Sequence, residues 1–165
     1  MDIIFNVIPE QTFWSILLFI HFLMAVTLMA AVTLQAVTVL MPARQAAGGY
    51  IDSGPVPPAV YTAIIVPLYV IQMLLGAFIY LKYRLYVRIP MEQLRHWWTL
   101  GGFEFKEHIL AMGLGLLPAY WYFWQQPQSM EHATVRKWLT IFLAVSVWYG
   151  FVSGHIANDF RGIGS

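Results

Sequence analysis

The chain has 165 residues, of which 59% are hydrophobic and only 10% are charged, and its formal net charge is +1. Soluble domains average about 45–50% apolar and about 25% charged residues, so this composition excludes an ordinary water-soluble globule. The near-neutral charge excludes a clustered basic surface for nucleic acid. The absence of cysteine excludes disulfides, iron–sulfur clusters and thiolate ligation of haem.

Four long stretches of the sequence contain no Asp, Glu, Lys or Arg: residues 11–43, 53–81, 108–130 and 138–158. Each exceeds the roughly 20 apolar residues with which a helix crosses a hydrocarbon core about 30 Å thick. Backbone groups in lipid must find their hydrogen bonds within helices. The sequence therefore predicts an all-α integral membrane four-helix bundle. It forms a single transmembrane domain over residues 1–165, with spans at about 13–40, 59–80, 105–124 and 137–158.

The connections between the predicted spans differ in composition. Residues 45–58 are rich in glycine and proline, which excludes a continuous helix there. Lys82 to Lys106 carries five Lys and Arg residues and is expected to be the main polar loop, with an amphipathic interfacial helix from Met91 to Leu100. In the second span, Pro67 is expected to introduce a kink unless a neighbouring helix satisfies the freed backbone carbonyl.

The distribution of Lys and Arg predicts the orientation of the spans. Six of these residues lie on the side that holds both termini and the second connection, and three lie on the other side. The positive-inside rule then places both termini in the cytoplasm, with the chain in a bacterial cytoplasmic membrane.

His21 lies about 12 Å into the first span, at 1.5 Å per residue. An ionisable ring at that depth in a bilayer is functional by default. His108 opens the third span and His155 closes the fourth, so all three rings are expected in the same half of the membrane. Imidazoles from different helices of an apolar bundle are the usual ligands of haem b. We therefore predict haem b with His21 as an iron ligand and either His108 or His155 as the second.

Two observations bear on this prediction without deciding it. His21, Leu28 and Gln35 share one helix face at seven-residue spacing, which suits a flat macrocycle but equally suits ordinary helix packing. Lys106 lies beside His108 in an acidic segment, where it is expected either to act near a redox centre, on a propionate or a proton, or to be a solvated, snorkelling side chain. The alternative for the histidines is that His21 hydrogen-bonds a neighbouring helix while the other two lie among the lipid headgroups.

Three short segments carry a resemblance to a known family. They are Phe19-Ile20-His21-Phe22-Leu23 in the first span, Val66-Pro67 with Leu75-Gly76 in the second, and Phe105-Lys106 at the start of the third. In these the chain resembles the small four-helix bacterial haem-dependent protoporphyrinogen oxidases and the related membrane domain of copper-resistance D-type proteins. The resemblance implies binding of haem b and oxidation of protoporphyrinogen, with His21 and Lys106 important. The family's Pro-Arg pair has only a displaced counterpart in Pro42 and Arg44, and its Asn-Glu-Pro signature is absent.

These observations lead to a first hypothesis of a haem-b membrane protein that passes electrons, either as a cytochrome b-type subunit or as a redox enzyme of the oxidase type. Its expected partners are the lipid bilayer and other membrane protein subunits. The second hypothesis is a non-catalytic structural subunit of a larger respiratory or photosynthetic complex. Its contacts would be the small-residue seam Ser146, Gly150 and Gly154 and the aromatic belt near Trp121 and Trp124. A transporter or channel is the third, and it has less support because the other spans carry no ionisable group as deep as His21.

Overall fold

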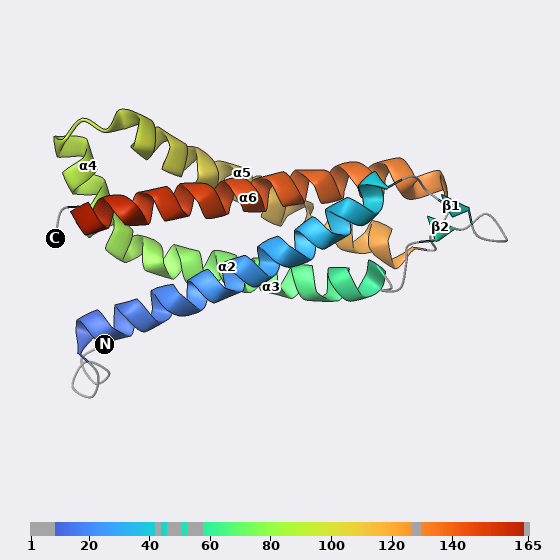
Figure 1. The fold of residues 1–165 in the computed structure, drawn as a ribbon, viewed down its shortest axis with the longest axis horizontal. Coiled ribbons are helices and arrows are strands. Elements are labelled where there is room, and N and C mark those ends of the chain that lie inside the picture. Colours follow the sequence, from blue (N-terminus) through green and yellow to red (C-terminus); the bar gives the residue numbers. More distant parts are fainter. Residues whose placement is uncertain (1–8, 42–43, 46–50, 53–57, 127–129, 164–165) are drawn as a thin grey trace.

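Four long helices form the protein in the computed structural model, which describes residues 9–41, 44–45, 51–52, 58–126 and 130–163 (Figure 1). They are α2 (Glu10–Leu40), α3 (Pro58–Tyr83), α5 (Trp97–Gln125) and α6 (Ala133–Ile163). Helix α2 packs against α3 and α6, and α5 packs against the same two helices. The all-α prediction is thus confirmed, with one long helix at each predicted span.

The two ends of the bundle differ. At one end, β1 (Arg44–Gln45) and β2 (Ile51–Asp52) pair antiparallel in the connection from α2 to α3. Most of the glycines and prolines of this connection, at residues 46–50 and 53–57, lie outside the described residues. The start of α2 and the end of α6 lie together at the opposite end (Figure 1). A short 3₁₀ turn, η2 (Met130–His132), leads into α6.

Three helical segments of the described chain are long and apolar enough to cross a membrane: Glu10–Leu40, Val60–Gln93 and Ala133–Asp159. Helix α5 is not one of them, although a third span was expected at residues 105–124. Its first half carries Glu104, Lys106 and Glu107, and its second half is rich in tyrosine and tryptophan. Both features lower the hydropathy of the windows that would have to cross the membrane.

The prediction of a polar loop between Lys82 and Lys106 is wrong. Helix α3 runs unbroken through Pro67 and continues through a π-helical segment, η1 (Arg84–Arg88), into α4 (Ile89–Gln93). Arg84, Arg88 and Glu92 lie on this helical continuation, where Arg88 contacts Glu92 at 2.8 Å and Glu104 of α5 at 3.3 Å. Charge therefore marks the solvated end of the helices rather than a loop.

The predicted interfacial helix from Met91 to Leu100 is also wrong. The chain turns after α4, and α5 already begins at Trp97. Arg95 adopts φ 58°, in the left-handed region that ends a helix. The amides of Leu94 and His96 bond to the carbonyls of residues 90 and 91, which closes the turn.

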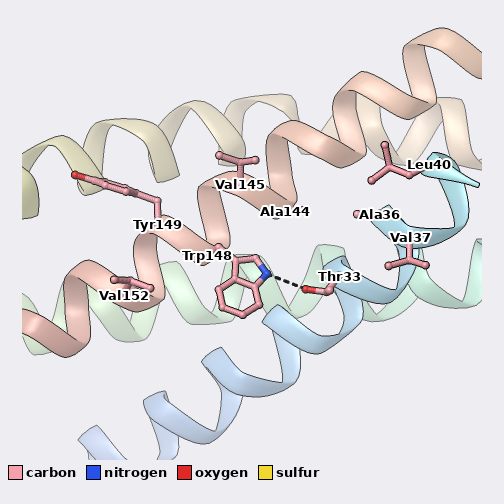
Figure 2. A pocket seen from close by; sticks show the side chains of 9 residues that line it. All are labelled: Thr33, Ala36, Val37, Leu40, Ala144, Val145, Trp148, Tyr149 and Val152. Atoms are coloured by element: carbon pink, nitrogen blue, oxygen red, sulfur yellow. Dashed lines mark hydrogen bonds between the residues drawn. The ribbon is translucent and has the colours of Figure 1, made fainter.

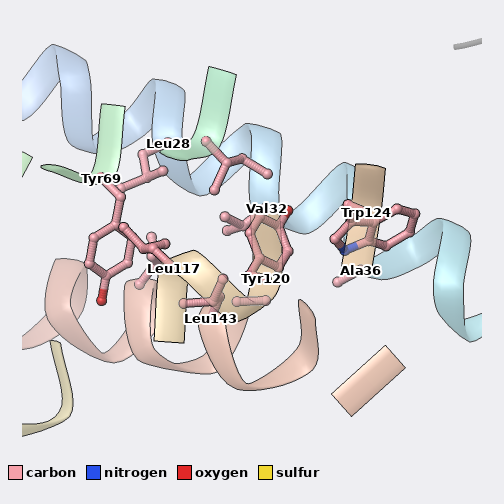
Figure 3. Close-up of a cluster of buried hydrophobic side chains, with 11 residues drawn as sticks. Leu28, Val32, Ala36, Tyr69, Leu117, Tyr120, Trp124 and Leu143 are labelled. Atoms are coloured by element: carbon pink, nitrogen blue, oxygen red, sulfur yellow. The ribbon is translucent and has the colours of Figure 1, made fainter. Parts of the chain in front are cut away.

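Two clusters of buried side chains hold the helices together. The larger lies in the half of the bundle nearer β1 and β2 and draws on all four long helices (Figure 3). It consists of Leu28, Val32, Ala36, Ile65, Tyr69, Leu117, Tyr120, Trp124, Leu143, Ala144 and Val147. The smaller lies near α4 and consists of Tyr83, Val87, Met91, Leu100, Phe103 and Ala157. The candidate site lies between the two clusters.

The small-residue seam of α6 faces the inside of the bundle. Ser146 is buried and donates a hydrogen bond to the Phe142 carbonyl at 2.7 Å. A Cβ added at Gly150 would lie 3.0 Å from Leu110 of α5, so the glycine allows these two helices to approach closely. Gly154 lines the cavity described below.

Candidate functional site

A cavity of about 730 Å³ lies between the four long helices. Its volume falls within the range of about 300–1,000 Å³ that is typical of small-molecule sites. The walls are mostly apolar and aromatic. Of the residues predicted for the site, His21, Lys106 and His155 all line this cavity.

His21 reaches the cavity because α2 is a continuous helix from Glu10 to Leu40. Residues seven apart on it share a face, and the other two members of this face, Leu28 and Gln35, are buried. On the facing helix α3, the side-chain amide of Gln72 lies beside the ring, with its Nε2 3.2 Å from His21 Nε2. A Cβ added at Gly76, one turn further along α3, would lie 3.4 Å from His21 Cε1. The glycine therefore lets the imidazole lie flat against α3.

The hydrogen bonds of Gln72 assign the tautomer of His21. Gln72 Nε2 donates to the His21 carbonyl oxygen at 3.0 Å, which fixes the orientation of the amide. The second N–H of the same nitrogen then points to His21 Nε2, which must accept with its lone pair. The ring proton accordingly belongs on Nδ1.

Polar atoms without partners gather at the cavity. The buried side-chain atoms of the described residues that have no hydrogen-bond partner are His21 Nδ1, Gln72 Oε1, Tyr83 Oη and Gln35 Nε2. The first three belong to residues that line the cavity. An unsatisfied buried polar group costs about 1–3 kcal/mol, and such groups are rare in proteins unless something else satisfies them. The cavity therefore offers a polar ligand several free hydrogen-bonding groups.

Two lysines supply positive charge to the cavity. Lys106 Nζ lies 3.4 Å from the centroid of the Phe103 ring, which itself stacks on Tyr83 at 3.9 Å. Lys82 lies near the start of α2, where its Nζ contacts Glu10 at 2.5 Å. Glu107 lines the same cavity and adds a carboxyl group. The cavity is therefore amphipathic, with aromatic walls and charged groups of both signs from α3 and α5.

The structure separates the two histidines that were predicted as alternative second ligands. His155 lines the cavity, and its ring stacks on Phe151 at 6.4 Å. Its side chain is 62% exposed and lies 3.9 Å from Asp159. His108 is exposed on α5, with Nδ1 2.8 Å from the Glu104 carbonyl, and does not belong to the lining of the cavity. Only His155 is thus brought to the same cavity as His21.

The donor set is compatible with haem b. Within the described residues no group of three or more His, Asp or Glu side chains is arranged to hold a bare metal ion. Haem needs fewer protein ligands, because its macrocycle supplies four of the donors and the protein supplies one or two. His21 offers one imidazole whose Nε2 lone pair is engaged by the Gln72 amide, and aromatic side chains line the walls. Lys106 offers a partner for an acidic substituent, and Lys82 offers a second one if it exchanges its ion pair with Glu10.

Sequence reasoning missed Gln72 and Tyr83. Gln72 carried a usable signal, because it is the one amide in an otherwise apolar or aromatic stretch of α3, and polar groups at such depth are costly unless they have a partner. Tyr83 carried none, because a tyrosine near the end of a span is typical of the membrane interface.

No family model, curated protein or solved structure matches this chain. The resemblance to the haem-dependent protoporphyrinogen oxidases therefore stays a prediction that depends on the segments quoted above.

Proposed function

We propose that the protein spans a membrane with all four long helices and has both termini in the cytoplasm. Large apolar side chains point outward from each helix, for example Ile16, Leu74, Met112 and Val145, which are 50%, 67%, 58% and 61% exposed. Soluble monomers rarely expose apolar patches larger than a few hundred Å², whereas lipid favours them. The start of α2 and the end of α6 lie at the same end of the bundle, as this topology requires (Figure 1).

We further propose that the cavity binds haem b through His21 and that the protein transfers electrons. The observation that carries the proposal is the position of His21, whose imidazole lies in a cavity built by all four helices with the Nε2 lone pair facing the Gln72 amide. Histidine at the interior of a helix bundle is a frequent ligand of haem iron. Bound haem would supply one-electron redox chemistry at this position.

The residues around His21 have separate roles in this proposal. Gln72 holds the ring against α3 before haem binds, because its amide spans both the backbone carbonyl and Nε2. Ligation through Nε2 requires the Gln72 N–H to leave that nitrogen. Lys106 and Lys82 bind the acidic substituents of the ligand, and Phe103 and Tyr83 keep water from its apolar face.

An oxidase activity toward protoporphyrinogen is the finer form of the proposal that the resemblance implies. It is supported by one geometric observation, which is that the two residues implied by the resemblance, His21 and Lys106, line the same cavity. The structural-subunit alternative has less support, because Ser146 is buried, Gly150 lies against Leu110 of α5 and Trp124 is only 4% exposed. Of the residues named for its contacts, Trp121 is the more accessible, at 42% exposed.

Reduced-minus-oxidised spectra of protein purified in a mild detergent test the proposal. Wild-type protein should show the α-band of a b-type haem, and His21→Ala should lose it. His108→Ala is the matched control and should keep the wild-type spectrum, because His108 lies outside the cavity lining. His155→Ala should shift the position of the α-band, because His155 would supply the second imidazole from the same cavity. A colourless wild-type protein, or a spectrum that His21→Ala leaves unchanged, would overturn haem binding at this site.

A further inference from the structure

The walls of the cavity are not equally closed. Its α3 and α5 sides include the buried residues Tyr83, Val87 and Phe103. Its α2 and α6 sides include the buried residues Leu28 and Val147 but reach the surface at Phe19, Phe22 and His155, which are exposed. One opening of the cavity therefore lies between the first half of α2 and the second half of α6.

Helices α2 and α6 are close over only part of their length. Figure 1 shows them crossing in the half of the bundle nearer β1 and β2 and diverging toward the chain ends. In the close half, Trp148 Nε1 donates to Thr33 Oγ1 at 2.9 Å above an apolar groove (Figure 2). In the diverging half, the rings of Phe22 and Phe151 meet with their centroids 5.9 Å apart.

The chemistry of this opening is apolar and aromatic. Phe22 and Phe151 face each other across it, and the ring of His155 is parallel to that of Phe151, within 3°. A Cβ added at Gly154 would meet no atom within 4 Å, so α6 leaves space beside the aromatic pair. In a protein that spans a bilayer, the sides of the helices face lipid rather than water.

We propose that the slit between Phe22 and Phe151 is the passage through which a flat, membrane-dissolved tetrapyrrole moves between the lipid and the cavity. This inference rests on the proposed haem function. The aromatic pair parts to admit a planar apolar ring, and it closes the cavity to water when the rings are in contact. The acidic edge of the ligand then contacts the lysines. Because the slit faces lipid, the site takes its ligand from the bilayer rather than from the aqueous phase.

The cysteine-free sequence permits a direct test. A Phe22→Cys, Phe151→Cys double variant is closed with a short, reducible bifunctional methanethiosulfonate and placed in lipid vesicles. The vesicles are then mixed with others that carry metal-free protoporphyrin IX or haem. Closing the slit should slow uptake of both about tenfold or more, and a reductant should restore it. The matched control is Thr33→Cys, Trp148→Cys, which links the same two helices outside the cavity and should leave uptake unchanged.

The outcomes separate this inference from the proposed function. If the closed Phe22–Phe151 variant takes up tetrapyrrole as fast as its reduced form, the passage is elsewhere and the inference is overturned, while haem binding stands. If the control pair slows uptake equally, general stiffening explains the result and the inference is overturned as well. If the reduced protein takes up neither haem nor metal-free porphyrin, both the inference and the proposed function fail.

Discussion

Replacement of Gly113 by alanine tests how closely α5 approaches α3 and α6. A Cβ at this position would overlap with the hydroxyl of Tyr69, and it would lie 3.0 Å from Tyr69 Cζ and 3.4 Å from Leu143. The tyrosine is held in place, because it is 1% exposed and its hydroxyl donates to the Leu110 carbonyl at 2.9 Å, and a shift toward the cavity that it lines would break this bond. The added methyl group must therefore displace the ring or separate the helices.

The expected size of the effect follows from three contributions. Overpacking a core costs about 1–3 kcal/mol, and loss of the Tyr69 hydrogen bond costs about 0.5–1.5 kcal/mol. Alanine in place of glycine regains about 1 kcal/mol of helix propensity. Gly115→Ala is the matched control on the same helix, because a Cβ there would meet no atom within 4 Å. Since both variants gain the same propensity, Gly113→Ala should be less stable than Gly115→Ala by about 1.5–4.5 kcal/mol.

The assay is reversible unfolding of the purified protein in mixed micelles, followed by helical circular dichroism as a denaturing detergent is added. Wild-type protein, Gly113→Ala and Gly115→Ala are compared under identical conditions. If Gly113→Ala unfolds at the same detergent fraction as Gly115→Ala, the close packing of Gly113 against Tyr69 is wrong, and with it the assignment of α3 and α5 as neighbours at this level.

Three further predictions concern the site, the core and the topology. Gln72→Leu should raise the affinity for haem roughly 2- to 13-fold, because the hydrogen bond to Nε2 no longer has to break, and a haem titration giving a lower affinity would contradict this. Tyr120→Phe leaves Gln35 Oε1 buried without its donor and should destabilise the protein by about 1–3 kcal/mol in the unfolding assay. Green fluorescent protein fused after residue 165 should fluoresce and alkaline phosphatase fused there should be inactive, and the reverse pattern would refute a cytoplasmic C-terminus.

The sequence was sufficient to predict the four long helices and the residues that share one face of α2. Uncharged runs of sequence located all four long helices. A segment that lies in lipid must be apolar, and it must be helical so that its backbone groups form hydrogen bonds with one another. Seven-residue spacing placed His21 on the same face as Leu28 and Gln35, and the structure buries both of those residues. These features depend on local periodicity, which a single sequence displays directly.

The rest depends on contacts between distant parts of the chain. Gln72 lies 51 residues from His21, and no local pattern reveals that α2 and α3 bring them together. The helices η1 and α4 were missed because the charged residues were interpreted as a loop. A charged helix end is stable where its side chains are solvated or paired, as Arg88 is with Glu92 and Glu104. The difference between His108 and His155 likewise depends on the rotation of α5 and α6 about their axes. That rotation is set by packing, for example by Gly150 against Leu110.

The most direct test of the central claim is the haem content of the purified wild-type protein, measured as the pyridine haemochromogen against protein concentration, with His21→Ala purified in parallel. The account predicts b-type haem in stoichiometric amount in the wild type and its loss in the variant, while both proteins keep the same helical circular dichroism. Equal haem content in the two proteins, or none in wild-type protein from cells that synthesise haem freely, would contradict it.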